Sequence, residues 1–112
     1  MSSLYECVVS VVNHGYTDLV MEAARAAGAK GGTVLSGHGT SNREVTEFFG
    51  VTITPEKDVV LILVPSAIRD KILSAINAGA GMSTRGMGIS FSIPVSDVVG
   101  LVKPGEELPE NH

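Results

Sequence analysis

The segment Val59-Val60-Leu61-Ile62-Leu63-Val64 is apolar at every position, with Lys57-Asp58 before it and Pro65 after it. Its β-branched and leucine side chains predict a strand. Successive side chains of a strand point to opposite faces of the sheet, so this strand presents apolar groups on both faces. Such a strand is stable where both faces are covered, which predicts a central place in a buried sheet.

Three other segments predict further strands. Leu4 to Val12 is rich in valine, Thr33 to Ser36 follows a pair of glycines, and Ile89 to Ile93 alternates apolar residues with serine. Strict alternation is typical of a strand with one buried face. The chain therefore predicts a sheet of four strands.

Two long helices are predicted between these strands. Thr17 is the expected N-cap of the first and Gly28 its end, and Ser66 is the expected N-cap of the second. Apolar residues recur at helical spacing and predict one buried stripe on each helix. The first stripe consists of Leu19, Val20, Ala23, Ala24 and Ala27, and the second of Ile68, Ile72, Leu73 and Ile76.

A third, short helix is expected between the second and third strands. Ser41-Asn42-Arg43-Glu44 matches a capping box and predicts a helix through Val45 and Phe48 to Gly50. Phe48-Phe49 is expected to join the core, since aromatic residues prefer burial. Residues 51–56 are expected to form a loop.

The order strand, helix, strand, insertion, strand, helix, strand predicts an α+β, ferredoxin-like double βαβ sandwich with an antiparallel sheet. Two helices can cover only one face of four strands, yet the strand at 59–64 is apolar on both sides. Another copy of the chain is the simplest cover for the second face. We expect one domain over residues 1–103, a flexible tail at 104–112, and a homo-oligomer.

A glycine-rich segment, Gly79-Ala80-Gly81-Met82-Ser83-Thr84-Arg85-Gly86-Met87-Gly88, links the second long helix to the last strand. Bare backbone N–H groups in such a loop can form an anion-binding nest, and Arg85 adds a planar cation suited to phosphate or carboxylate. A plain connector after a helix C-cap is the alternative interpretation. The order helix, loop, strand is not that of Walker or Rossmann phosphate sites, so neither motif is indicated.

Composition argues against several function classes. Twelve acidic and eight basic side chains give a net charge of −4, which argues against nucleic acid as a partner. No apolar run approaches the roughly 18 residues that cross a bilayer, so we expect no membrane insertion. The start, Met1-Ser2-Ser3-Leu4, lacks the features of a secretory signal, and we expect a cytoplasmic protein. Cys7 is the only cysteine and is expected to act as a small buried hydrophobe.

No enzyme active site is indicated. The sequence has no nucleophile elbow, no His-x-x-x-His, and no pair of acids flanking the glycine loop. Asp58, Asp70 and Asp97 are interpreted as strand-edge, helix-surface and turn residues. We therefore expect no catalytic residues and no required cofactor.

The succession of segments resembles the nitrogen-regulatory PII signalling superfamily over nearly the whole chain. The segments are Lys30-Gly31-Gly32-Thr33-Val34, Gly37-His38-Gly39, Asp58 to Val64, and Gly86 to Val99. This resemblance implies a trimer of ferredoxin-like subunits, with an effector nucleotide in each cleft between neighbours. It also implies that the loop at residues 37–56 regulates a partner protein, commonly a membrane transporter or an enzyme.

The resemblance implies the position of the nucleotide site as well. Two Gly-x-Gly segments face the nucleotide in that family, and here they are Gly37-His38-Gly39 and Gly86-Met87-Gly88. We expect His38 to contact the base or to titrate near neutral pH, and Arg85 and Lys103 to supply positive charge. The expected site for an adenine nucleotide consists of Thr33, Gly37, His38, Gly39, Thr40, Arg85, Gly86, Met87, Gly88 and Lys103.

The chain also departs from the family pattern. Ile89 stands where the family has a phosphate-binding lysine, and Gly100 and Val102 stand where it has paired arginines. Each lost charge-assisted bond is worth about 1.5–3 kcal/mol, so triphosphate binding should weaken, and we expect a mono-, di- or cyclic nucleotide. Residues 40–56 contain no tyrosine, so control by tyrosine modification is not expected.

A second hypothesis is a divalent-metal-binding trimer of the cation-tolerance type, which shares this fold. Its candidate ligands would be His14, His38, His112 and Cys7. These residues lack the tight spacing that marks zinc sites, so the site prediction contains no metal ligand.

Overall fold

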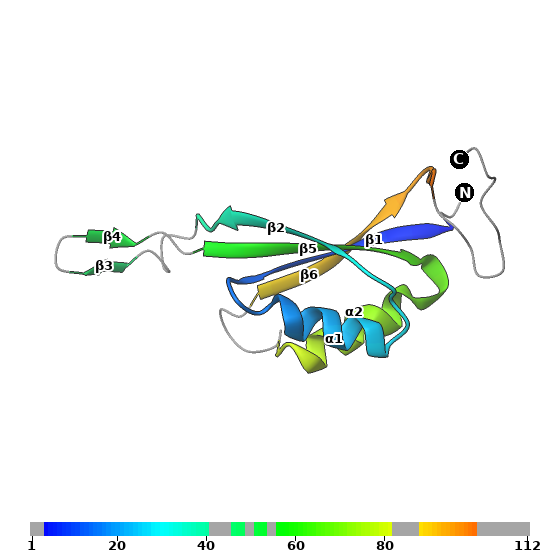
Figure 1. Ribbon diagram of the computed structural model, residues 1–112, viewed down its shortest axis with the longest axis horizontal. Coiled ribbons are helices and arrows are strands. Elements are labelled where there is room, and N and C mark those ends of the chain that lie inside the picture. The colour runs from blue at the N-terminus through cyan, green and yellow to red at the C-terminus, as the bar shows by residue number, and fades with distance from the viewer. Residues whose placement is uncertain (1–3, 41–45, 49–50, 54–55, 82–87, 101–112) are drawn as a thin grey trace.

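The computed structural model describes residues 4–40, 46–48, 51–53, 56–81 and 88–100 of the chain. In chain order the elements within these residues are β1 (Tyr5–Asn13), α1 (Thr17–Ala26), β2 (Thr33–His38), β3 (Thr46–Phe48), β4 (Val51–Ile53), β5 (Glu56–Pro65), the 3-10 turn η1 (Ser66–Ile68), α2 (Arg69–Gly79) and β6 (Gly88–Val95) (Figure 1). The tail predicted at 104–112 lies outside the described residues.

The main sheet has four strands in the order β2-β5-β1-β6, and every neighbouring pair is antiparallel. β5 lies between β2 and β1, as its continuous apolar sequence predicts. Each helix connects two strands that are not adjacent, with one strand inserted between them. This is the double βαβ arrangement of the ferredoxin-like fold, so the predicted α+β fold is confirmed.

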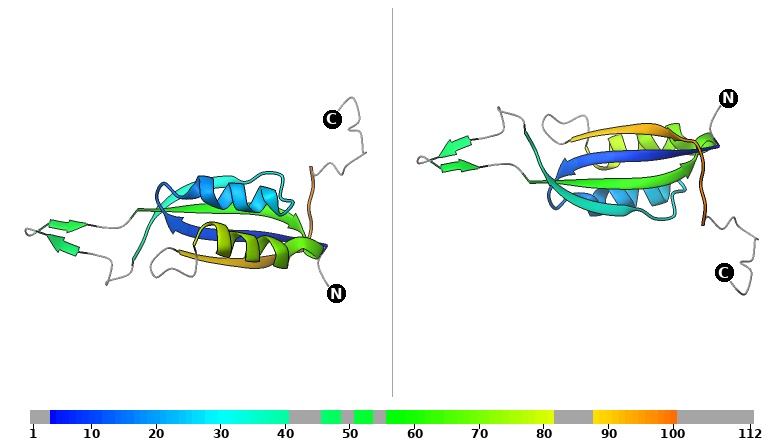
Figure 2. Two further views of the ribbon diagram at one scale, coloured as in Figure 1. Left: turned by 90° about the horizontal axis from the view of Figure 1, so that it is seen from below. Right: turned by 90° about the horizontal axis from the view of Figure 1, so that it is seen from above.

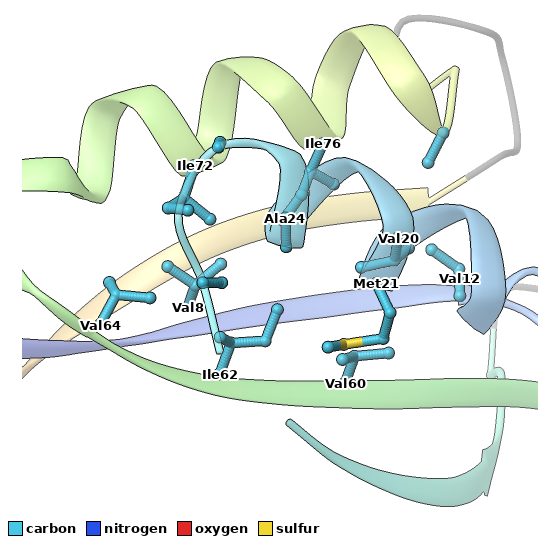
Figure 3. Close-up of a cluster of buried hydrophobic side chains, with 13 residues drawn as sticks. Val8, Val12, Val20, Met21, Ala24, Val60, Ile62, Val64, Ile72 and Ile76 are labelled. Carbon is cyan, nitrogen blue, oxygen red and sulfur yellow. The ribbon is translucent and has the colours of Figure 1, made fainter. Parts of the chain in front are cut away.

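Both helices lie on the same face of the sheet (Figure 2). The core forms between them and the helix-facing side chains of β1 and β5 (Figure 3). Its fully buried members include Val8, Val12, Val20, Val60, Ile62, Ile72 and Ile76. The stripe predicted for α2 is confirmed, since Ile72 and Ile76 are buried and Ile68 and Leu73 pack against the core.

The opposite face of the sheet is open in the single chain. It carries a row across three strands, formed by Leu61, Val9 and Phe91. Val9 is buried in the middle of this row, whereas Phe91 is 41% exposed. The same face exposes Leu35, Leu63, Ile89 and Ile93. The strand predicted to be buried on both sides is therefore covered on one side only within one copy.

β6 turns its apolar side chains toward this open face and its serines toward the helices. Ser90 is the register partner of Ser10, and their Oγ atoms lie 2.8 Å apart. Ser10 is fully buried, so this bond satisfies a hydroxyl that would otherwise be costly to bury. The alternation at residues 89–93 thus places serine on the helix side of the sheet, where Ser90 contacts β1, and apolar side chains on the open side.

The starts of both helices differ from prediction. Tyr16 occupies the N-cap position of α1, with Thr17 already inside the helix, and no side chain caps it. α2 begins at Arg69 with Ile68 as its N-cap, because η1 forms first. Leu19 was expected in the buried stripe but is exposed, and Met21 fills the core instead. Within the described stretches, neither helix is long and apolar enough to cross a membrane.

The prediction of a short helix after β2 is wrong. Thr46–Phe48 and Val51–Ile53 are antiparallel strands that form a separate two-stranded sheet, seen at one end of the molecule in Figure 1. Threonine, valine and isoleucine favour strands, and this preference outweighs the capping box. The loop predicted at 51–56 is wrong at residues 51–53, which form β4, and at residue 56, where β5 begins. The capping box at 41–44 and the predicted burial of Phe48-Phe49 lie outside what is described.

Candidate functional site

One end of the main sheet gathers two of the predicted ligand segments. Here β2 ends at His38 opposite Glu56, β1 ends at Asn13 opposite Lys57, and β6 begins at Gly88 opposite Val12. Gly37 and Gly88 therefore lie at the same end of the sheet but on its two outer strands. Three strand spacings separate them, or about 14 Å.

A hollow of about 210 Å³ opens beside β2 at this end. It is lined by His14, Ser36, Gly37, His38, Glu56, Lys57 and Asp58. Two predicted site residues, Gly37 and His38, thus line one depression, and Gly39 and Thr40 follow them in the chain. The hollow is smaller than the roughly 300–1,000 Å³ of most ligand pockets, so within one copy it can hold only part of a nucleotide.

Asp58 is the buried polar group of this hollow, with only 5% of its surface exposed. His14 Nδ1 lies 3.2 Å from its Oδ1, and the Gly15 backbone N–H donates to its Oδ2 at 3.2 Å. The hydrogen bond with His14, then that with Gly15, holds the pKa of the Asp58 carboxyl below its ordinary value. The same bond and the charge of Asp58 raise the pKa of His14 above 6.5. The two residues therefore favour each other's charged forms.

The rest of the hollow mixes both signs of charge. Lys57 Nζ donates a hydrogen bond of 2.6 Å to Asn13 Oδ1, which ties β5 to the end of β1. Glu56 lies beside it, and His38 faces Glu56 from β2. A ligand seated here meets imidazole and ammonium donors as well as carboxylate acceptors. The hollow can bind a small polar group, and its net charge depends on the protonation of histidine.

A second hollow, of about 440 Å³, lies at the opposite edge of the sheet between α2 and β6. Its lining consists of Leu73, Ser74, Asn77, Gly88, Ile89 and Ser90. Gly88 is the predicted site residue that falls here. A Cβ atom at this position would lie 2.2 Å from the Val11 carbonyl oxygen, so the close approach of β6 to β1 itself requires glycine.

Of the remaining predicted site residues, the structure describes Thr33, which lies away from both hollows. Thr33 begins β2 opposite Leu61, about 16 Å along the strand from His38. Arg85, Gly86, Met87 and Lys103 lie outside the described residues. The structure therefore places Gly37 and His38 in one hollow, Gly88 in another, and Thr33 away from both.

Sequence reasoning missed His14 and Asp58 as partners. His14 was considered only as a candidate metal ligand and Asp58 was interpreted as a strand-edge residue, yet the two are joined. The available signal was an aspartate at the start of an otherwise apolar strand, since such a carboxylate needs donors once the strand is central. Among the described residues, no group of three or more His, Cys, Asp or Glu side chains is arranged to hold a metal ion.

Comparison with known proteins identifies the family. Residues 6–105 match the family model described as Nitrogen regulatory protein P-II. The chain belongs to the P-II family. It is a P-II-like signalling protein, and no curated protein sequence matched it.

A solved P-II structure shows the same fold. The structure of Arabidopsis thaliana PII bound to citrate superposes with a TM-score of 0.66 at 23% sequence identity. The match covers 98% of this chain and 90% of that one. The P-II fold therefore extends over the sheet and both helices described above.

Proposed function

We propose that this P-II protein is a homotrimer that senses a small anionic effector, an adenine nucleotide, between its subunits. Ligand binding changes the surface offered by residues 37–56, and this surface regulates a partner protein such as a membrane transporter or an enzyme. The protein acts in the cytoplasm, is not itself an enzyme, and needs no cofactor.

The observation that carries this proposal is the position of the two glycine segments. Gly37 and Gly88 lie at the same end of the sheet but on opposite outer strands, with β5 and β1 between them. A ligand that contacts both segments within one copy would have to span two strands. Between copies, the β2 edge of one subunit can meet the β6 edge of the next, and a single ligand can then contact both segments.

The open face of the sheet supports the trimer. Its exposed side chains are large and apolar, with Ile89 at 62% and Leu35 and Ile93 each at 49%. Burial of apolar surface contributes about 25 cal/mol per Å², so a few hundred Å² per subunit favours association by several kcal/mol before its entropic cost. P-II proteins are typically trimers, and this face is the part of the described surface best suited to contact the other subunits.

The citrate in the Arabidopsis P-II structure supports an anionic effector. The position of Ile89 argues against strong triphosphate binding, because an aliphatic side chain stands where a phosphate-binding lysine is expected. Loss of charge-assisted hydrogen bonds weakens binding by about 1.5–3 kcal/mol each, which favours a ligand with fewer phosphates. We therefore propose ADP, AMP or a cyclic adenine nucleotide ahead of ATP.

The site also explains how binding can be transmitted. β2 ends at His38 in the first hollow, and the β3–β4 pair follows it in the chain before β5 returns at Glu56. A ligand at Gly37 and His38 therefore contacts the base of the segment proposed to meet the partner. If the ligand has different affinities for two arrangements of this segment, binding shifts the population between them.

Isothermal titration calorimetry against ATP, ADP, AMP and cyclic AMP tests the proposal. We expect binding by at least one nucleotide, and an Arg85→Ala variant should bind it about tenfold or more weakly if Arg85 contacts phosphate. Arg25→Ala, which removes an exposed arginine from α1, is the matched control and should bind like the wild type. Absence of binding by all four nucleotides would refute the nucleotide-sensor proposal and leave the fold unaffected.

A further inference from the structure

The turn between β1 and α1 is fastened to the first three residues of β5. The His14 backbone N–H donates to the Glu56 carbonyl oxygen at 3.2 Å, and Lys57 Nζ donates to Asn13 Oδ1 at 2.6 Å. Asp58 completes the contact through His14 Nδ1 and the Gly15 N–H. We call these contacts between residues 13–15 and 56–58 the clasp.

The two side chains at the centre of the clasp have very different access to water. The side chain of Asp58 is 7% exposed, whereas that of His14 is 64% exposed. A proton can therefore reach His14 from solvent, while the carboxylate keeps its partners in place. Neutral His14 contributes a hydrogen bond alone, and protonated His14 adds an ion pair to the same contact.

Among the residues that the structure describes, the charged and titratable groups that line the hollow with His14 come from two strands. Asp58, Glu56 and Lys57 belong to β5, and His38 belongs to β2. Glu56 and Asp58 place two negative charges against the single positive charge of Lys57. Protonation of His14 adds a positive charge to this set, which makes the hollow more favourable for an anion.

We propose that His14 and Asp58 form a proton-operated clasp that tightens the hold of the β1–α1 turn on β5 and strengthens binding of an anionic effector in the adjacent hollow. The effect on effector binding rests on the function proposed above, whereas the clasp itself does not. No ligand is needed for His14 to take up a proton or for its bond to Asp58 to strengthen.

The direction of the pH dependence follows from the two residues. The pKa of His14 is raised above 6.5 by Asp58, so its contribution is complete below pH 6.5 and is lost as the pH rises through the folded-state pKa. The pKa of Asp58 is lowered below 3.8, so its contribution is lost only in stronger acid. The clasp is therefore tightest between about pH 3.8 and 6.5 and loosens toward alkaline pH.

Nuclear magnetic resonance of the ligand-free protein tests the clasp directly. The imidazole of His14 and the backbone amide of Gly15 should titrate with one shared midpoint above pH 6.5. Asp58→Asn should move the His14 midpoint to lower pH, whereas His38→Gln, which removes the other histidine of the hollow, should leave it in place. A Gly15 amide that does not follow His14, or an unchanged midpoint in Asp58→Asn, would overturn the clasp. If a variant does not fold, the comparison of the His14 and Gly15 midpoints in the wild-type protein still tests the clasp.

Calorimetry with ADP at pH 6 and pH 8 tests the coupling to the effector. The affinity of the wild type for ADP should be lower at pH 8 than at pH 6. This fall should exceed the fall in His14→Asn by about 1.5- to 5-fold, which is the size of effect that an exposed ion pair supports. Asparagine can donate to Asp58 from a position near Nδ1 but does not titrate. The same pH dependence in both proteins would overturn the coupling. A shared midpoint together with no ADP binding at either pH would support the clasp and count against the proposed nucleotide function.

Discussion

Arg69 Nη1 lies 2.9 and 3.1 Å from the two carboxylate oxygens of Glu6. Glu6 belongs to β1 and its side chain is 9% exposed, whereas Arg69 begins α2 and is 37% exposed. A carboxylate at this depth needs a charged partner, and the guanidinium reaches it from the first turn of the helix. The pair therefore attaches the start of α2 to the beginning of β1, one of the two inner strands of the sheet.

Arg69→Met should destabilise the fold because it leaves the Glu6 carboxylate buried without its cation. We expect the melting temperature to fall by about 4–8 °C. The double variant Glu6→Leu/Arg69→Met should recover much of the loss, since replacing both partners by apolar groups removes the unpaired charge. Lys71→Met, an exposed position on the same helix, is the control. Equal melting temperatures for Arg69→Met and Lys71→Met would contradict the structural role of the pair.

The helices approach closely where α2 ends. A Cβ atom added to Gly79 would lie 2.7 Å from the Cβ of Ala23 on α1, a distance that forces the helices apart. Gly79→Ala should cost about 1 kcal/mol, because overpacking of about 1–3 kcal/mol exceeds the gain in helix propensity. Thermal denaturation measures this loss.

Removing the opposing methyl group checks the cause. In an Ala23→Gly background, Gly79→Ala should be tolerated better than in the wild type, which a double-mutant cycle detects as a coupling. Additive effects of the two substitutions would show that the contact between the helices is not responsible.

The two glycines of the proposed ligand segments have different structural roles. A Cβ at Gly88 would collide with the Val11 carbonyl oxygen at 2.2 Å, whereas a Cβ at Gly37 meets no atom within 4 Å. Gly88→Ala should therefore lower the melting temperature strongly, by about 10 °C or more, and Gly37→Ala should change it little. Because Gly37→Ala should change stability little, an effect of this substitution on ligand binding would indicate that the ligand lies close to Gly37. Similar losses of stability in both variants would contradict this distinction.

The fold could be predicted because a few apolar segments can be buried in only a small number of ways. The apolar run at 59–64 requires a central strand, and the stripe that includes Ile72 and Ile76 requires a helix over the sheet. The segment after β2 was mispredicted because a local capping signal competed with the strand preference of Thr46 and Val51 to Ile53, and short elements are decided by such small differences.

The site was less predictable because it depends on pairings across the sheet. Gly37 and His38 could be singled out by composition, but nothing local relates His14 to Asp58, which are brought together by the register of β1 with β5. Likewise, the alternation of Ile89 to Ile93 indicated one apolar face without indicating that this face points away from the helices. Register and the side of the sheet are tertiary properties, so residue spacing alone does not specify them.

The clasp should also affect stability. The difference in melting temperature between wild type and His14→Asn should be largest between about pH 4 and 6.5 and should shrink toward pH 8.5, as His14 loses its proton. Differential scanning calorimetry at matched ionic strength measures it, and added salt should reduce the difference because the pair is partly exposed. A difference that grows with pH would contradict the assigned direction.

The open face of the sheet predicts the oligomeric state. Phe91 and Leu19 are equally exposed, at 41%, but Phe91 lies in the apolar row of the sheet with Val9 and Leu61, whereas Leu19 is on α1. Light scattering coupled to size-exclusion chromatography should find a trimer for the wild type. Phe91→Glu should dissociate it, because a carboxylate buried in an apolar interface lacks a partner. Leu19→Glu should remain trimeric, since it introduces the same charge at an equally exposed position on α1, away from the open face of the sheet. A trimer that survives Phe91→Glu, or a wild-type monomer, would contradict assembly through this face.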